Sequence, residues 1–111
     1  MKDDYVELVL SAVERIPPGR VASYGDIAEF VGQGGPRQVG QVMALHGGAV
    51  AWWRVVRSDG RPARHHEEQA LAQLATESTP IRHGRIDMRG ARFAFTGEAS
   101  KRDSPWGSQG T

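Results

Sequence analysis

Two adjacent tryptophans in the middle of the chain are the residues whose types are best suited to recognition chemistry. Trp52 and Trp53 lie in the hexapeptide Ala-Trp-Trp-Arg-Val-Val at positions 51–56. Their indole rings offer aromatic surface either to a ligand or to the protein core, but neither ring is a nucleophile. The 111-residue chain has no cysteine, which excludes a cysteine nucleophile, a disulfide and a thiolate metal site.

Positive charge is concentrated around this tryptophan pair. The net charge of the whole chain is only +1, but residues 1–35 carry a net charge of −3 and residues 36–111 a net charge of +4. Five arginines between positions 36 and 64 stand against the single acid Asp59. They are Arg37, Arg54, Arg57, Arg61 and Arg64. A polyanion would bind this middle tract and not the N-terminal segment. Arginines that merely keep a small protein in solution are the alternative, and charge alone leaves both open.

Four histidines are the remaining candidates for metal binding or catalysis. They stand at positions 46, 65, 66 and 83. The side chains of the adjacent pair diverge on a helix, and no His-Glu-x-x-His spacing exists. The sequence has neither a glycine-rich phosphate loop nor a Ser/His/Asp set with a local signature. We therefore expect no metal and no cofactor.

Three amphipathic segments predict the elements that position these residues. A Pro-Pro-Gly run at 17–19 ends a first helix, because proline cannot donate to a helix ladder. Ser23 offers an N-cap for a second helix at 24–31, and Pro36 favours the start of a third helix at 36–46. Two short helices joined by a glycine turn are typical of a helix-turn-helix. The apolar positions of the three helices are Val6, Val9, Leu10, Val13 and Ile16, then Ile27, Ala28 and Val31, then Val39, Val42, Met43 and Leu45.

The second half of the sequence predicts shorter elements. A further helix is expected at 66–77, with two leucines facing the core. Extended pieces at 85–88 and 92–95 flank Arg89-Gly90 and predict a hairpin or wing. The expected fold is mainly α with small β elements, in a single helix-turn-helix or winged-helix-like domain.

Length and composition limit the domain count and the compartment. At 111 residues and 39% hydrophobic, the chain can bury one modest core, which we assign to residues 1–96. Glycine, serine and charged residues dominate from Gly97 onward, so we expect a disordered tail at 97–111. No apolar run approaches the ~20 residues of a membrane span, and the N-terminus is polar and acidic. We expect a cytoplasmic monomer.

Five segments in this order resemble the DNA-binding domain of the O6-alkylguanine-DNA alkyltransferases. They are residues 19–28, 36–40, 52–56, 59–60 and 84–88. In that family a Pro-Cys-His-Arg-Val motif carries the alkyl acceptor, and here Trp52 falls at the position of the cysteine and Trp53 at that of the histidine. Tryptophan in place of the cysteine marks the alkyltransferase-like proteins, although most of these retain the histidine.

The resemblance implies a non-catalytic DNA damage sensor. Such a protein binds O6-alkylguanine in duplex DNA by flipping the base out of the stack. It shields the lesion from alkyltransferases and signals to nucleotide excision repair proteins. A helix-turn-helix DNA-binding regulator without lesion specificity is the alternative, which Trp53 keeps open.

The resemblance also implies roles for residues of the helix-turn-helix. Arg37 matches the arginine that enters the duplex and fills the space left by the flipped base. Tyr24 matches the tyrosine that crowds the neighbouring phosphate. Ser23 caps a helix and can contact phosphate, main-chain amides near Gln38 can hold phosphate, and Gly40 permits close approach to DNA or to the second helix.

The implied lesion pocket combines residues from distant parts of the sequence. Its expected members are Tyr24, Trp52, Trp53, Arg54, Val55 and Arg64. Arg64 would stack on the alkylated guanine by cation–π attraction, and His65 is the alternative for that contact. For Trp53, core packing is as good an interpretation as a direct role. Arg54 is expected to brace the loop internally, with a phosphate contact as the alternative, and Glu77 is expected to be a helix-end or hydrogen-bonding residue.

Overall fold

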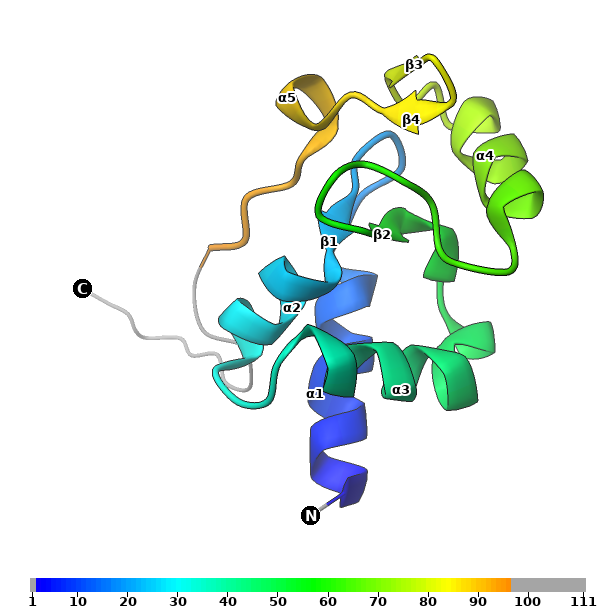
Figure 1. Cartoon of the computed structure of the whole chain (residues 1–111). Coiled ribbons are helices and arrows are strands. Elements are labelled where there is room, and N and C mark those ends of the chain that lie inside the picture. Colours follow the sequence, from blue (N-terminus) through cyan, green and yellow to red (C-terminus); the bar gives the residue numbers. More distant parts are fainter. Residues whose placement is uncertain (1, 97–111) are drawn as a thin grey trace.

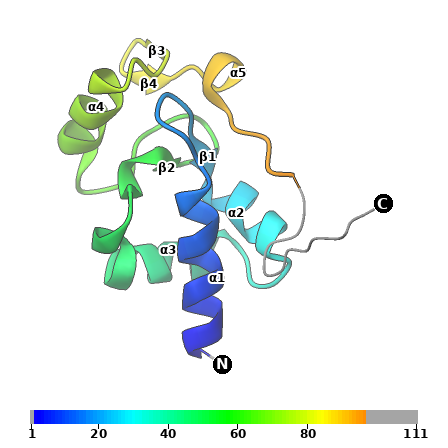
Figure 2. The ribbon, with the colours of Figure 1, turned by 180° about the vertical axis from the view of Figure 1, so that it is seen from behind.

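Three helices form one half of the protein. The structure, a computed structural model, describes residues 2–96. Helix α1 (Lys2–Glu14) runs behind α2 (Tyr24–Val31) and α3 (Pro36–His46) in Figure 1 and in front of them in Figure 2. Helices α2 and α3 have the ranges predicted from the sequence, and α1 ends at Glu14, shortly before the Pro-Pro-Gly run at 17–19.

Capping residues fix the boundaries of the second helix. The Ser23 hydroxyl accepts a hydrogen bond from the Asp26 amide at 2.9 Å, and the Asp26 carboxylate accepts one from the Ser23 amide at 3.1 Å. This reciprocal pair is the predicted capping box. Gly32 ends the helix with a φ of 85°, a left-handed conformation that glycine adopts without strain.

The inner faces of the three helices make the main core. Val9, Val13 and Ile16 of the N-terminal segment pack with Ile27 and Val39, and all five are at most 1% exposed. Burying a side chain of this size stabilises the fold by about 1.5–3 kcal/mol.

One apolar position of the third helix does not pack in the core. Leu45 in the last turn of α3 is 78% exposed, whereas Val39 and Val42 on the same helix are buried. The helix ends one residue later and the chain turns into the short 3₁₀ helix η1 (Gly47–Ala49). The last turn of α3 therefore extends beyond the part of the helix that packs against α1 and α2.

A short parallel strand pair joins the middle of the chain to the helix-turn-helix. The 3₁₀ helix η2 (Trp52–Arg54) leads into β2 (Val55–Val56), which pairs with β1 (Ala22–Ser23). Ala22 lies opposite Val55 and Ser23 lies opposite Val56. Because the pairing is parallel, Arg57, which follows β2, comes beside Tyr24 at the start of α2.

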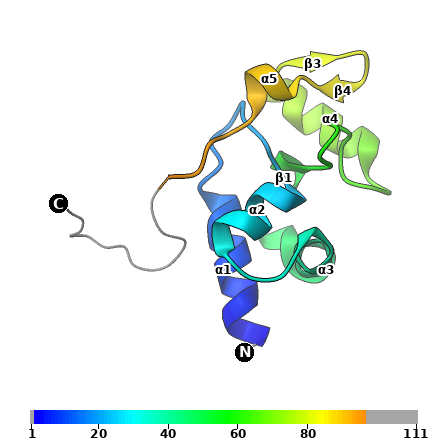
Figure 3. The same ribbon diagram turned by 60° about the vertical axis from the view of Figure 1, so that its left-hand side comes forward.

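The C-terminal elements pack on the other side of this strand pair. They are α4 (Glu67–Thr76), β3 (Ile81–Arg82), β4 (Arg85–Ile86) and α5 (Met88–Ala91), and they lie at the end of the molecule away from the N-terminus (Figures 1 and 3). A second core cluster forms there from Val21, Val56, Leu74, Ile86 and Ala91. Of the two leucines predicted to face the core, Leu74 is fully buried and Leu71 is half-buried.

The predicted hairpin at 85–95 is wrong in its position. The strands are β3 and β4, paired antiparallel through His83-Gly84, whose φ angles are 52° and 77°. Arg89-Gly90, the predicted turn, lies inside α5. Residues 92–95 form no second strand, since their one β contact is the isolated bridge between Val21 and Arg92.

Several contacts tie these C-terminal elements to the rest of the described chain. The Ile86 amide donates to the Gly60 carbonyl at 2.8 Å. Gly60 has a φ of 88°, and a Cβ there would lie 2.5 Å from the Ile86 carbonyl oxygen, so only glycine fits. The Arg92 guanidinium binds the Asp26 carboxylate. Burial acts to raise the pKa of Asp26, but the hydrogen bonds from Arg92 and Ser23 outweigh it and the pKa lies below the usual 3.8.

The predicted class, mainly α with small β elements around a helix-turn-helix, is confirmed. The tail expected at 97–111 lies outside the described residues. None of the helices in residues 2–96 is long and apolar enough to span a membrane.

Candidate nucleic-acid interface

A groove of about 950 Å³ opens between the start of α2, helix α3 and the loop that precedes α4. It brings together residues that the sequence separates by up to 45 positions, from Tyr24 to Gln69. Those predicted as site residues are Tyr24, Arg37, Gly40, Trp52, Arg64 and the alternative His65. Its volume lies in the range of roughly 300–1,000 Å³ that is typical of small-molecule pockets.

The charged side chains that line the groove are all basic. Arg37, Arg57 and Arg64 contribute guanidinium groups, and His65 and His66 contribute imidazoles. No Asp or Glu is among the described residues that line it. A groove with this composition attracts an anionic ligand such as a phosphate backbone.

Arg57 and His66 were not predicted as site residues. Arg57 belongs to the basic tract, and its Nε donates to the Pro62 carbonyl at 3.0 Å while its terminal nitrogen lies 3.4 Å from Glu67. His66 directly precedes α4 and lines the groove. The only sequence signal for Arg57 was its charge, and only the fold shows that its side chain reaches the groove.

Arg37 stands at the second position of α3, on the edge of the groove. Its side chain is exposed, and no carboxylate in the described part of the chain pairs with it. The first turn of α3 contains no acidic residue, so the guanidinium meets the positive end of the helix dipole uncompensated. A cation placed there is available to an external anion.

Of three other predicted helix-turn-helix residues, one lines the groove and two make hydrogen bonds within the protein. Gly40 lines the groove, and a Cβ there would meet no atom within 4 Å. The glycine therefore keeps the groove surface low and is not needed for packing against α2. Gln38 is exposed but is not among the lining residues, and its side-chain oxygen accepts from the Gly35 amide at 2.9 Å. Ser23 is buried in its capping role.

Tyr24 is half-buried at the first position of α2, where it forms one wall of the groove. Burial raises the pKa of its phenol above the usual 10.0, although the positive charge of Arg57 acts in the opposite direction. The phenol therefore keeps its proton at neutral pH and can donate a hydrogen bond.

Trp52 lines the groove between two other aromatic rings. The Trp53 ring meets it edge-on, with centroids 5.7 Å apart and planes at 83°. The His66 ring is also 5.7 Å away, at 64°. Edge-to-face pairs at such distances are favourable.

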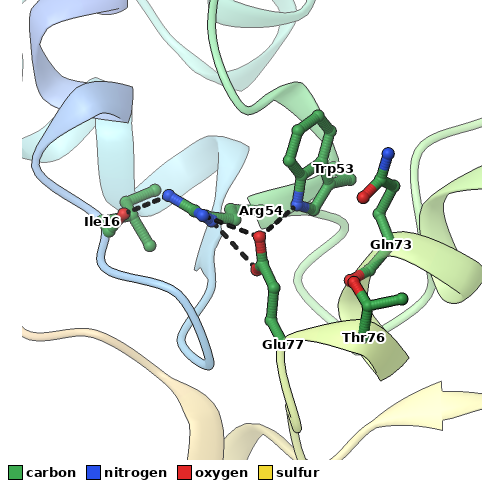
Figure 4. A network of polar contacts seen from close by, with 6 residues as sticks. All are labelled: Ile16, Trp53, Arg54, Gln73, Thr76 and Glu77. Atoms are coloured by element: carbon green, nitrogen blue, oxygen red, sulfur yellow. Dashed lines mark hydrogen bonds and ion pairs between the residues drawn. The ribbon is translucent and has the colours of Figure 1, made fainter.

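Trp53, Arg54 and Val55 lie behind the groove and are not among its lining residues. The Trp53 indole N–H donates to Glu77 at 3.0 Å, and Arg54 forms two further hydrogen bonds to the same carboxylate at 2.7 and 3.0 Å (Figure 4). Arg54 also donates to the Ile16 carbonyl at 2.9 Å. The internal brace expected of Arg54 and the hydrogen-bonding role expected of Glu77 are confirmed. Val55 is fully buried in β2.

This network lowers the pKa of Glu77. Partial burial acts to raise the pKa, but the hydrogen bonds from Arg54 and Trp53 outweigh it, so the pKa lies below the usual 4.5. A lowered folded-state pKa means that the unfolded chain binds the proton more tightly. The stabilisation is therefore fully present above about pH 4.5 and is lost as the pH falls through the folded-state pKa.

Glu77→Gln is expected to lower the free energy of unfolding by about 1–3 kcal/mol at neutral pH, because the half-buried Arg54 loses its charged partner. The difference in free energy of unfolding from the wild type should shrink in acid, where the side chain at position 77 is neutral in both proteins. Denaturant unfolding across this pH range measures the effect, and Glu68→Gln, at an exposed site on α4, is the control for the charge change. A difference that stays constant down to the lowest pH would contradict the role of the ionised carboxylate.

His65 adopts a φ of 71°, an uncommon conformation for a residue other than glycine. It lies on the groove beside Arg64, and such strained residues often occur at functional sites. No group of three potential metal ligands occurs within residues 2–96.

Comparison with known proteins identifies the family of the chain. The sequence profile of the DNA-binding domain of 6-O-methylguanine DNA methyltransferase matches residues 4–79, well over half of the chain. The chain belongs to this family. The matched range includes the whole helix-turn-helix, both tryptophans and Glu77.

Named relatives place the chain among the alkyltransferase-like members of the family. It is 46% identical over 61 residues to alkyltransferase-like protein 1 of Schizosaccharomyces pombe, a match that covers 52% of this chain and 56% of the relative. It is 32% identical over 102 residues to the DNA base-flipping protein of Escherichia coli, covering 85% of this chain and 78% of that protein. The sequence match thus covers little more than half the length of the yeast relative.

Solved structures agree with this placement. The structure of S. pombe Atl1 in complex with damaged DNA containing O6-carboxymethylguanine superimposes with a TM-score of 0.74 at 31% identity. The match covers 83% of this chain and 96% of that one. A second complex of the S. pombe protein with DNA gives a TM-score of 0.65 at 37% identity, covering 72% of this chain and 81% of that one. An alkyltransferase-like fold is therefore shared over most of this chain.

Proposed function

We propose that this alkyltransferase-like chain is a non-catalytic sensor of O6-alkylguanine in duplex DNA. The observation that carries the proposal is the basic groove with Trp52 on its wall and Arg37 at its edge. Arg37 enters the duplex and takes the place of the flipped base, while Tyr24 crowds the adjacent phosphate. The similarity to a DNA base-flipping protein and to a structure solved in complex with damaged DNA supports this assignment.

The groove then holds the flipped guanine without altering it. Trp52 stacks on the base or its alkyl group, and Arg64 or His65 covers the other side. Transfer of the alkyl group needs a nucleophile such as a thiolate, and the chain has no cysteine. Trp52 occupies the acceptor position and Trp53 the position of the histidine, so the site has neither an acceptor nor a proton relay.

A lesion that is held but not repaired has two consequences. The bound protein shields the alkyl group from true alkyltransferases, and the persistent complex marks the site for nucleotide excision repair proteins. We propose that the protein does this as a cytoplasmic monomer, without metal or cofactor. Excision that proceeds equally well without the protein would remove the signalling role.

The affinity for two duplexes that differ by one O6-methylguanine tests the central claim. We expect the alkylated duplex to bind at least about tenfold more tightly, a difference of about 1.4 kcal/mol. The salt concentration must be fixed, at roughly 0.1–0.15 M, because it sets the non-specific affinity. Equal binding would favour a helix-turn-helix DNA-binding regulator without lesion specificity.

A further inference from the structure

Trp53 is adjacent to the groove wall but is not part of it. Its ring is half-buried against the second core cluster and is absent from the residues that line the groove. The proposed function therefore gives it no contact with DNA, although it replaces the histidine of the repair enzymes. Its own contacts indicate another role.

Two rings determine how Trp52 can lie. Trp53 meets it from behind the groove and His66 from the α4 side, each at a centroid distance of 5.7 Å. The His66 side chain is exposed, whereas Trp53 is anchored. Of the two neighbours, Trp53 is therefore the one that can hold the plane of Trp52.

The anchor of Trp53 is a charge-assisted hydrogen bond. Its N–H lies 3.0 Å from Glu77, whose side chain is 13% exposed, and the Arg54 guanidinium lies 5.8 Å from the Trp53 ring centroid. Hydrogen bonds to a charged acceptor are about twice as strong as neutral ones. Rotating the indole out of this orientation would break that bond, so the hydrogen bond fixes the ring.

The carboxylate that receives the bond is itself fixed. Arg54 binds both of its oxygens and also the carbonyl of Ile16, which follows α1 (Figure 4). The orientation of Trp53 is thus fixed by contacts with the end of α4 and with the residues that follow α1. Neither of these helix ends lines the groove.

We propose that Trp53 is a positioning residue, whose indole N–H on Glu77 sets the orientation of Trp52 and thereby the preference for alkylated over unmodified guanine. This inference rests on the proposed function of the groove. It concerns the preference and not the general affinity for DNA, because the proposed duplex contact Arg37 and the proposed phosphate contact Tyr24 belong to other elements.

Trp53→Phe and Trp53→His make a matched pair of tests. Both replace the indole by a smaller aromatic ring, but only histidine keeps a ring N–H donor. We expect Trp53→Phe to lower the ratio of affinities for O6-methylguanine and unmodified duplexes by about three- to tenfold, as for the loss of one hydrogen bond. The affinity for the unmodified duplex should not change, and Trp53→His should retain most of the ratio.

A second readout does not involve DNA. When Trp106→Phe is added to each variant, Trp52 becomes the single tryptophan of the chain, and its fluorescence anisotropy reports the nanosecond motion of that ring. We expect a lower anisotropy with phenylalanine at position 53 than with histidine. Thermal unfolding identifies any variant that fails to fold. In that case benzothienylalanine, in which sulfur replaces the indole N–H, provides the donor-free ring at position 53.

The possible outcomes distinguish a failure of the positioning role of Trp53 from a failure of the proposed lesion-sensing function. Equal affinity ratios and equal anisotropies in the phenylalanine and histidine variants would overturn the positioning role. A loss of affinity for both duplexes alike would also overturn it, because the effect would then be structural. A wild type without lesion preference would refute the proposed function, and the anisotropy comparison alone would then decide whether Trp53 orients Trp52.

Discussion

Arg37→Ala is expected to remove the preference for alkylated DNA, a loss of at least about tenfold in the affinity ratio, or about 1.4 kcal/mol. Extruding a base costs a few kcal/mol of stacking and pairing, and an inserted guanidinium offsets part of that cost. Arg37 is exposed at the groove edge and has no described ion-pair partner. Its removal should therefore leave the fold intact. Binding titrations with both duplexes measure the effect.

The control for Arg37 is an arginine outside the groove. Arg82 on β3 is exposed and does not line it, so Arg82→Ala removes the same charge without touching the proposed insertion site. We expect Arg82→Ala to lower the affinity for both duplexes slightly at most, and by the same factor. An Arg37→Ala protein that still prefers the alkylated duplex as strongly as the wild type would disprove the role of Arg37 in flipping.

Trp52→Ala is expected to weaken binding of the alkylated duplex by about 1–3 kcal/mol, the contribution of one aromatic–base stacking contact. In affinity this is roughly five- to 150-fold. The unmodified duplex should bind as before, because its bases need not enter the groove. Trp52→Phe keeps an aromatic face and should recover part of the loss.

A different result for Trp52 would be equally informative. If Trp52→Ala lowered the affinity for both duplexes to the same extent, Trp52 would contribute to DNA binding in general or would stabilise the conformation of η2. Thermal unfolding of the variant separates these two cases, because Trp52 packs against Trp53 and His66 and its loss can loosen the loop.

The helical part of the fold was predictable because local signals dominate there. Ser23 closes its capping box and Pro36 begins α3, as predicted. The hairpin was misplaced because its turn residues, His83-Gly84, are not the Asn-Gly or Asp-Gly pairs that mark such turns. Arg89-Gly90 looked like a turn but lies in α5. Local sequence gave no sign that a helix would form at these residues.

The site was predictable as a set of segments but not as a surface. The sequence indicated that Trp52 and Arg37 belong to one site, and the groove brings them together. It did not show which of two adjacent tryptophans faces outward, because that depends on the Glu77 carboxylate, 24 residues away from Trp53. Arg57 was missed for the same reason, since its position depends on the turn after β2.

The loop between β2 and α4, which forms part of the groove wall, has a consequence for binding kinetics. The segment between β2 and α4 is tied at Gly60 to Ile86 and internally through Arg57, so part of the groove wall is fixed before any ligand arrives. Binding to a preformed site requires little ordering of loops. Association with different lesions should then occur at similar rates, and differences in affinity among alkyl groups should appear in how long each complex lasts.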